Sequence, residues 1–345
     1  MSGITYLARR VLLAALVLLG VLLITFVVSH VVPGDPARLY AGSRAGEAAL
    51  AEVRRELGLD QPLPRQFLHY VLSSTRGDFG YSYRTKRPIL EDLKARLPAT
   101  LELVILATFL AVVAGVPTGV LAAAHFGTRL DRLVRVVSIA GVSMPAFWLA
   151  LLLQLFFFLW LGWLPLGGRV GLAVSFTDPI TPITGFDLVD AALTLNWVAW
   201  RDAAWHAVLP TVVLATFPYS LVVRMTRASM LEVLSETYVS AARAAGLGEG
   251  EILFKLALKN AIVPTLTVMG LVFAFSITGA VLVETIFQWP GVGSYMLEAI
   301  LNNDVPVLFA VTLVVTVIYI VVNVLVDLLQ AALDPRIRVG RRQEG

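Results

Sequence analysis

Three acidic residues lie where an ionisable group is unusual, directly at the ends of long uncharged stretches. They are Glu102, Glu284 and Asp327. A carboxylate at the edge of an apolar segment either is solvated and paired with neighbouring loops, or takes part in a gate or a solute pathway. We therefore treat these three residues as candidates for gating or for lining a pathway.

Other residue types that carry chemistry are scarce. The chain has no cysteine, which excludes disulfides and thiolate chemistry, and its four histidines stand apart from one another. His206 has no second histidine or carboxylate three or four residues further along. A metal site or proton relay at His206 is therefore disfavoured. We expect the chain itself to bind no metal and no cofactor.

Two further functions are weighed and disfavoured. Gly141-Val142-Ser143 offers a serine nucleophile for an intramembrane protease, but no histidine lies in a nearby apolar stretch at the depth needed to activate it. Neither a His-Glu-x-x-His pair nor a Gly-x4-Gly-Lys-Ser/Thr nucleotide loop occurs. A self-sufficient secondary transporter would show an inverted repeat of broken helices with charges at mid-depth, and we find none.

The elements that must position these residues are membrane helices. The chain is 58% hydrophobic and 15% charged, and about 20 apolar residues suffice to cross the hydrocarbon core of a bilayer. Only helices satisfy their own backbone when they cross lipid singly. The sequence therefore predicts an all-α polytopic membrane protein with six transmembrane helices, the first one retained because it lacks a signal-peptide cleavage site. The six stretches without Asp, Glu, Lys or Arg are Val11–Gly34, Leu103–Thr128, Val136–Gly168, Ala203–Val223, Ala261–Val283 and Val305–Val326.

Lys and Arg in the short loops predict that both termini lie in the cytoplasm. Short inner segments follow the positive-inside bias, whereas the long segment between the first two stretches translocates largely regardless of its charge. The net charge of +3 is dispersed among loops and so does not indicate nucleic acid as a partner.

Residues 33–98 are expected to form a helical extension outside the cytoplasm. Ala45–Leu57 is a helix candidate that stops at Gly58, and Arg65–Ser73 is a second one. A turn-rich stretch then begins at Arg76. The outer loop 166–202 is expected either to fold over the outer mouth of a pore or to be a plain connector with tryptophan anchors.

The cytoplasmic loop 224–260 carries the most informative pattern. One helical face is predicted to end at Gly246, a residue able to adopt the left-handed cap conformation, and a second short helix leads into the fifth membrane helix. Small exposed side chains would let a partner protein approach the backbone closely. The alternative is a plain amphipathic connector. The residues that share this face are Leu231, Leu234, Tyr238, Ala241, Ala242 and Ala245.

This loop resembles the coupling-helix motif of ATP-binding-cassette (ABC) importer permeases. Ser240-Ala241-Ala242 precedes Gly246 at the spacing of that motif, and Leu256-Ala257-Leu258 follows nine residues later. Ser240 stands where the motif has glutamate, and Lys259 stands where it has proline. A salt bridge of the kind that the motif's glutamate could form is therefore not expected here, whereas the glycine turn is. The rest of the chain is similar to the dipeptide, oligopeptide and nickel branch, first-permease type. Further segments that carry this resemblance are 32–37, 56–63, 77–82, 96–102, 206–210, 283–293 and 333–338.

The resemblance implies a type I ABC importer permease fold with a helical extracytoplasmic insertion. It implies residues 1–32 as the N-terminus and first membrane helix, 33–98 as the extension, 99–335 as the permease core and 336–345 as a cytoplasmic tail. It also implies a bacterial inner-membrane protein that imports dipeptides or oligopeptides, or alternatively nickel, haem or glutathione. The implied partners are membrane lipid, a second homologous permease, a solute-binding protein and two ATPase subunits that carry ATP and Mg.

The resemblance further implies two sets of site residues. Coupling to the ATPase is assigned to Tyr238, Ser240, Ala241, Ala242, Arg243, Gly246, Leu247, Leu256 and Leu258. Contact with the solute-binding protein is assigned to Arg76, Asp78, Phe79, Tyr81 and Tyr83.

Overall fold

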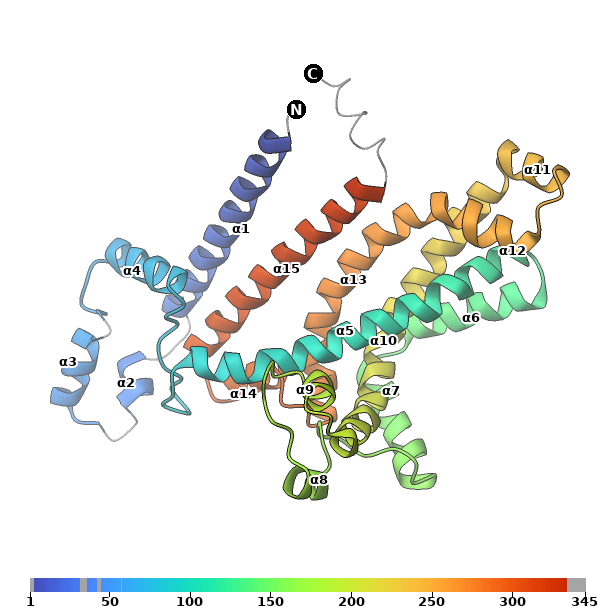
Figure 1. The fold of residues 1–345 in the computed structure, drawn as a ribbon. Helices are drawn as coiled ribbons and strands as arrows, with labels where there is room; N and C mark the ends of the chain where they lie inside the picture. Colours follow the sequence, from blue (N-terminus) through green and yellow to red (C-terminus); the bar gives the residue numbers. More distant parts are fainter. Residues whose placement is uncertain (1–2, 32–35, 42–44, 57, 334–345) are drawn as a thin grey trace. The chain divides into compact units, whose positions relative to one another are not determined.

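A computed structural model shows an all-helical chain, and it describes residues 3–31, 36–41, 45–56 and 58–333. Figure 1 shows the helices as coloured ribbons. The chain divides into two compact units, residues 1–95 with 295–320 and residues 96–294 with 321–345. We describe each unit by itself.

The first unit holds the first apolar helix and the short helices that follow it. Phe26 of α1 contacts the rings of Phe67 and Tyr70 in α4, and the hydroxyls of Thr25 and Tyr70 are 3.2 Å apart. Gly58 adopts a φ of +63°, in the left-handed region that we predicted would end the preceding helix. The helices of this part are α1 (Gly3–Val31), α2 (Pro36–Ala41), α3 (Glu47–Glu56) and α4 (Leu63–Thr75).

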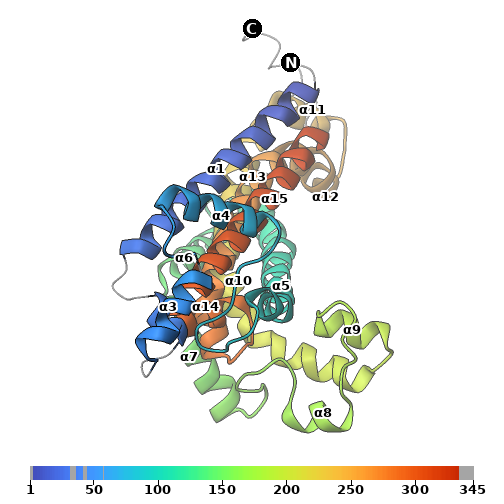
Figure 2. The ribbon, with the colours of Figure 1, turned by 90° about the vertical axis from the view of Figure 1, so that its left-hand side faces the viewer.

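The second unit is a bundle around α10 (Trp197–Leu234), which packs against α6 (Arg129–Ser143), α7 (Ala146–Leu153) and α13 (Leu258–Ile286). Figure 2 shows the loop 166–202, with its short helices α8 (Leu172–Thr177) and α9 (Asp187–Leu193), gathered at one end of α10. The remaining elements are α5 (Ile89–Ala124), η1 (Gln154–Trp160), α11 (Thr237–Ala244), α12 (Glu249–Glu251), η2 (Ile252–Ala257), α14 (Val292–Leu301) and α15 (Val305–Leu333), of which α5, α14 and α15 each contribute residues to both units.

Close packing of α10 depends on glycines in the neighbouring helices. Gly115 and Gly119 of α5 form a Gly-x3-Gly pair, and a Cβ on Gly119 would collide with Thr226 of α10. A Cβ on Gly141 of α6 would likewise meet the Oγ of Ser220. Small residues at such positions let membrane helices approach closely, so that van der Waals packing holds them together.

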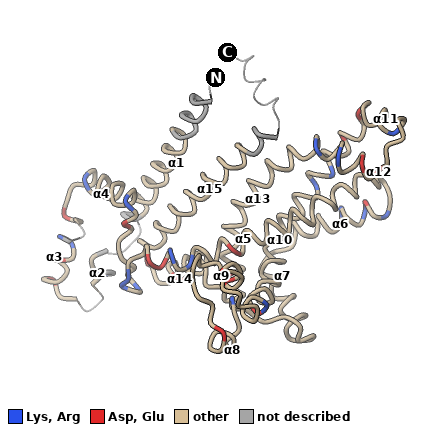
Figure 3. The backbone as a smooth tube through the Cα atoms, viewed as in Figure 1, with Lys and Arg blue, Asp and Glu red and all other residues tan. Residues whose placement is uncertain are grey.

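Within the described residues, each of the six predicted apolar stretches lies largely on helices. Within the described residues, four helices are long and apolar enough to cross a membrane, and a bent pair makes up to five. The segment Leu12–Val28 of α1 is a shorter apolar helix by the same measure. Figure 3 shows Lys, Arg, Asp and Glu gathered near helix ends and in loops. The all-helical, membrane-spanning character is confirmed.

We predicted one membrane helix in the third apolar stretch, but the structure shows a break in it. The run Arg129–Ser143 and the run Ala146–Trp160 meet at an angle of 106°. Met144 has extended backbone (φ −82°, ψ 123°) because the residue before a proline is pushed out of the helical region, and Pro145 has no N–H to continue the ladder.

Candidate functional site

The candidate coupling loop is a helical knuckle made of α11, a glycine turn, α12 and η2. The sequence pattern placed residues 231–245 on one helical face, but α10 ends at Leu234 and a new helix starts at Thr237. The break occurs where the Ser235 hydroxyl and backbone N–H both donate to the carbonyl of Glu232. Val239 is the buried anchor of α11. Most of the other α11 side chains are exposed, including Tyr238, Ser240, Ala241 and Arg243, whereas Ala242 is half-buried.

Gly246 ends α11 in the left-handed conformation that we predicted, with a φ of +84°. The Gly246 N–H donates to the carbonyl of Arg243 at 3.0 Å, and the Leu247 N–H donates to that of Ala242 at 3.2 Å. These two bonds define a Schellman cap, which satisfies carbonyls at a helix end. No heavy atom lies within 4 Å of an ideal Cβ at Gly246. The glycine is therefore required by its backbone conformation rather than by crowding within the chain.

Two side-chain contacts brace this turn. The Arg243 guanidinium donates twice to the Glu249 carboxylate, at 2.7 and 3.3 Å. The hydrogen bond with Arg243 lowers the pKa of Glu249 below its usual range. At the base of the knuckle, the Asn260 amide donates to the Tyr238 hydroxyl at 2.9 Å. An ion pair between Arg243 and Glu249 thus joins the two sides of the turn, and a hydrogen bond between Tyr238 and Asn260 joins the two arms at its base.

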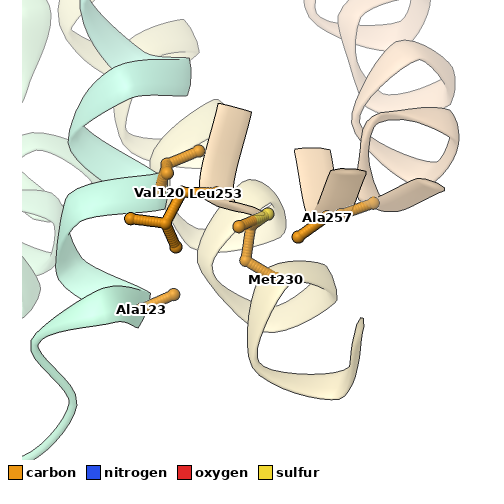
Figure 4. Packing of buried hydrophobic residues seen from close by; sticks show 6 residues of the cluster. Val120, Ala123, Met230, Leu253 and Ala257 are labelled. Carbon is orange, nitrogen blue, oxygen red and sulfur yellow. The ribbon is translucent and has the colours of Figure 1, made fainter. Parts of the chain in front are cut away.

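The return arm of the knuckle is part of the bundle core. Leu253 and Ala257 of η2 are buried against Met230 of α10 and against α5, in a cluster that Figure 4 shows from close by. Leu256 and Leu258 are half-buried beside it. Because interiors are close-packed, a displacement of the knuckle is passed on to α5 and α10 through these contacts. The cluster consists of Val120, Ala123, Met230, Leu253, Ala257 and Ala261.

Glu102 belongs to a buried charge cluster that fixes the loop 166–202. Its carboxylate pairs with the Arg169 guanidinium at 2.5 Å and accepts the Leu188 N–H at 2.9 Å. Arg169 also pairs with Asp187 at 3.1 Å and donates to the Gly185 carbonyl at 3.0 Å. Burial raises the pKa of Asp187 to about 6, although Arg169 acts in the opposite direction. This cluster fastens α9 and the start of the loop 166–202 to α5.

Glu284 is fully buried near the end of α13. The Thr100 hydroxyl donates to its Oε1 at 2.6 Å, and the Ser294 N–H donates to its Oε2 at 2.8 Å. Gly291 and Gly293 lie so close to this carboxylate that a Cβ on either would collide with it. Glu284 therefore holds the first turn of α14 against α5. Glu102 and Thr100 are two residues apart on α5, so the two acidic candidates lie in neighbouring clusters.

The remaining candidates lie elsewhere. Asp327 is in α15, but its side chain falls outside the described residues. The set assigned to a binding protein lies in the loop that precedes α5, where Arg76, Asp78 and Tyr81 are exposed and Phe79 and Tyr83 are half-buried. Burial, followed by the charge of Asp304, raises the pKa of Tyr83 to about 12.

Sequence reasoning missed the groups that hold these sites in place. Asp304 accepts hydrogen bonds from the Ser82 hydroxyl at 2.5 Å and from the N–H groups of Tyr83 and Arg84 at 3.0 and 3.1 Å. Asp202 lies one turn before His206, with 3.4 Å between its Oδ2 and the histidine Nδ1. A search backwards along the helix would have found Asp202. Nothing local in the sequence indicates the contact between Asp304 and a loop more than 200 residues away. No group of three metal-binding side chains occurs among the described residues.

Comparison with known proteins extends over nearly the whole chain. Residues 115–339 match the family model described as binding-protein-dependent transport system inner membrane component, and residues 3–104 match the model of its N-terminal part. The chain is 46% identical to the probable D,D-dipeptide transport system permease protein DdpB of Escherichia coli K12, over 94% of this chain and 95% of the relative. It is 42% identical to the di/tripeptide transport system permease protein DppB of Pseudomonas aeruginosa (98% and 100%) and 41% identical to the dipeptide permease DppB of Alkalihalophilus pseudofirmus (97% and 99%).

Proposed function

Because the chain belongs to the family of binding-protein-dependent transport system inner membrane components, we propose that it forms half of a translocation path for dipeptides and short oligopeptides. It is the multi-pass inner-membrane permease subunit of an ABC importer, and it is not itself an enzyme. The observation that carries the peptide assignment is the 41–46% identity, nearly end to end, with permeases named for dipeptides and tripeptides. Both the intramembrane protease and the self-sufficient transporter are disfavoured by this membership.

The partners in this proposal are a second homologous permease, two ATPase subunits that hold ATP and Mg, and an outer solute-binding protein. The exposed knuckle from Tyr238 to Leu247 is the contact for an ATPase subunit. Its support is geometric, since α11 presents small exposed side chains and the turn ends in a Schellman cap that leaves the backbone accessible. Leu256 and Leu258 complete the contact from its half-buried base.

Transport follows from closure of the ATPase pair, which pushes the knuckle. The Arg243–Glu249 pair and the Gly246 cap keep the turn in one conformation, so the push moves it as a unit. The shared core of Met230, Leu253 and Ala257 passes the motion to α5 and α10. Nucleotide then biases the bundle between inward-open and outward-open states, as a ligand biases any two-state element.

The outer surface receives the solute. Both termini lie in the cytoplasm in this proposal, which places residues 33–98 and the loop 166–202 outside. The loop 76–83 contacts the binding protein through Arg76, Asp78, Phe79, Tyr81 and Tyr83. Glu102, Glu284 and Asp327 act at the path or its gates, the first two by fixing the outer segments to α5.

Reconstitution tests this function. The purified chain, its sister permease, the ATPases and the binding protein are placed in proteoliposomes, and uptake of a labelled dipeptide is measured with and without ATP. We expect ATP-dependent uptake of the dipeptide only with all subunits present. Uptake of a nickel chelate, haem or glutathione in its place would transfer the assignment to that solute, and uptake by the lone chain would refute the ATP-driven mechanism.

A further inference from the structure

Four exposed arginines lie on the two helices α6 and α10. Arg129, Arg132 and Arg135 are on the first two turns of α6, and Arg224 is ten residues before the end of α10. The charge-free stretches begin or end at the adjoining residues, Val136 and Val223. The arginines are therefore at the level where an apolar span meets the polar boundary of the membrane.

The pairing of the two helices brings Arg135 and Arg224 to one edge of the bundle. Asp131 of α6 is bonded to Arg227 of α10, and Gly141, ten residues further along α6, packs against Ser220, seven residues earlier in α10. The helices therefore run antiparallel. Arg135 is one turn beyond Asp131, and Arg224 is one turn beyond Arg227 in the same direction, so both arginines lie at the same depth.

The charge of this edge is not neutralised from within. Asp131 is buried, and its oxygens already accept two bonds from Arg227, at 2.6 and 3.0 Å, and one from the Gly127 N–H at 3.1 Å. Arg135 approaches the same carboxylate only to 3.8 Å. In the part of the chain that the structure describes, no carboxylate pairs with Arg129, Arg132 or Arg224. The edge keeps an excess of positive charge.

Apolar side chains are exposed beside the arginines of α6. Phe126, Leu133 and Val136 are each at least 60% exposed. A soluble ATPase subunit would favour a polar surface, and free phosphate would make no favourable contact with these apolar side chains. Cations interleaved with exposed apolar groups match a molecule that has both an anionic head and acyl chains.

We propose that Arg129, Arg132, Arg135 and Arg224 bind the phosphate of an anionic phospholipid, whose acyl chains lie along Leu133 and Val136. The guanidinium groups offer paired N–H donors that suit phosphate oxygens. The bound lipid bridges α6 and α10 beside the Asp131–Arg227 pair, and so stabilises the packing of the first turns of α6 on α10. This inference rests on the membrane placement of the chain and not on which solute it carries.

Lipid retention on the intact importer tests the proposal. The complex is purified from membranes, incubated with equal amounts of phosphatidylglycerol and phosphatidylcholine that have the same acyl chains, and its retained lipids are counted by native mass spectrometry. We expect the wild type to prefer phosphatidylglycerol, and each Arg→Gln change among the four to lower that preference roughly five-fold, since each cation near a membrane surface contributes about a factor of that size. Arg201→Gln, which removes an exposed arginine at the other end of α10, is the matched control and should change it less than about two-fold.

Three results would overturn the proposal. An equal loss with Arg201→Gln would mean a general surface attraction, and release of the lipid by inorganic phosphate would assign the site to a free anion. Loss of the ATPase subunits from the four-fold Gln variant, with its lipid retention unchanged, would assign the arginines to a protein contact. The four-fold Lys variant keeps the charge and should keep most of the preference, which separates loss of the site from misfolding.

Discussion

Arg243 and Glu249 close the turn at Gly246, with 2.7 Å between the guanidinium Nε and a carboxylate oxygen. Both side chains are largely exposed, at 44% and 61%. Exposed ion pairs contribute little to folding stability. Its position explains the pair better. Arg243 in the last turn of α11 is joined to Glu249 in α12, across the turn at Gly246.

Charge reversal tests whether this pair works within the chain. We expect Glu249→Arg to reduce dipeptide uptake per ATP hydrolysed several-fold without changing the thermal stability, because repulsion opens the turn. The double variant Arg243→Glu with Glu249→Arg restores the attraction and should restore uptake. If the double variant is as defective as the single one, Arg243 acts on a partner subunit and not on Glu249.

The Glu102–Arg169 pair is expected to be costly to break. Arg169 is 12% exposed and Glu102 is 5% exposed by side chain, and removal of one partner leaves a buried charge unpaired. Arg169→Gln should destabilise the protein by about 3–5 kcal/mol, measured by chemical unfolding in detergent. The matched surface pair is Arg84–Glu298, at 48% and 42% exposure, where Arg84→Gln should cost less than about 1 kcal/mol. Equal costs for the two variants would contradict the account.

The stability of the loop 166–202 is expected to depend on pH through Asp187. Its pKa is raised from 3.8 to about 6, mainly by burial, so the folded state binds this proton more tightly than the unfolded state does. The resulting stabilisation is fully present below about pH 4 and is lost as the pH rises through about 6. Amide hydrogen exchange at residues 183–190 should therefore become faster over this range, after correction for intrinsic exchange rates. Asp187→Asn should remove the trend, and a trend that persists in this variant would assign it to another group.

Asp304 is expected to order the loop that precedes α5. The buried carboxylate accepts bonds from one hydroxyl and two backbone N–H groups in residues 82–84. Asp304→Asn removes the charge that strengthens these bonds and should cost about 1–3 kcal/mol. Limited proteolysis at residues 76–88 should become several-fold faster. Asp78→Asn is the control that should leave the rate unchanged, since within the described residues this exposed carboxylate accepts its hydrogen bond from the nearby Gly80 N–H.

Local signals in the sequence predicted the elements well. The charge-free stretches predicted helices because lipid leaves the backbone no other way to satisfy its hydrogen bonds. Glycine spacing predicted the left-handed conformation at Gly58 and Gly246, because a residue without Cβ adopts it at little cost. The 106° bend at Met144 and Pro145 was not predicted, because its size depends on how α6 and α7 each pack on α10.

Contacts between distant residues could not be predicted in this way. Glu102 is 67 residues from Arg169, and Ser82 is 222 residues from Asp304. Such pairs follow no periodicity, and in a single sequence any arginine is an equally good partner for any glutamate. Val239 was also missed as the anchor of α11, because the helical face was counted through the break at Ser235 and so shifted out of register.

The central claim is that the Gly246 turn couples ATP hydrolysis to transport, and one substitution series measures it most directly. Gly246 and Gly248 both have open space around an ideal Cβ, but Gly246 has a φ of +84° and Gly248 a φ of −69°. A left-handed residue with a Cβ costs roughly 1–2 kcal/mol, and asparagine tolerates this conformation better than most residues. In proteoliposomes, dipeptides imported per ATP hydrolysed should fall several-fold for Gly246→Leu, be partly restored for Gly246→Asn and stay at the wild-type value for Gly248→Leu. Wild-type coupling in Gly246→Leu would contradict the account.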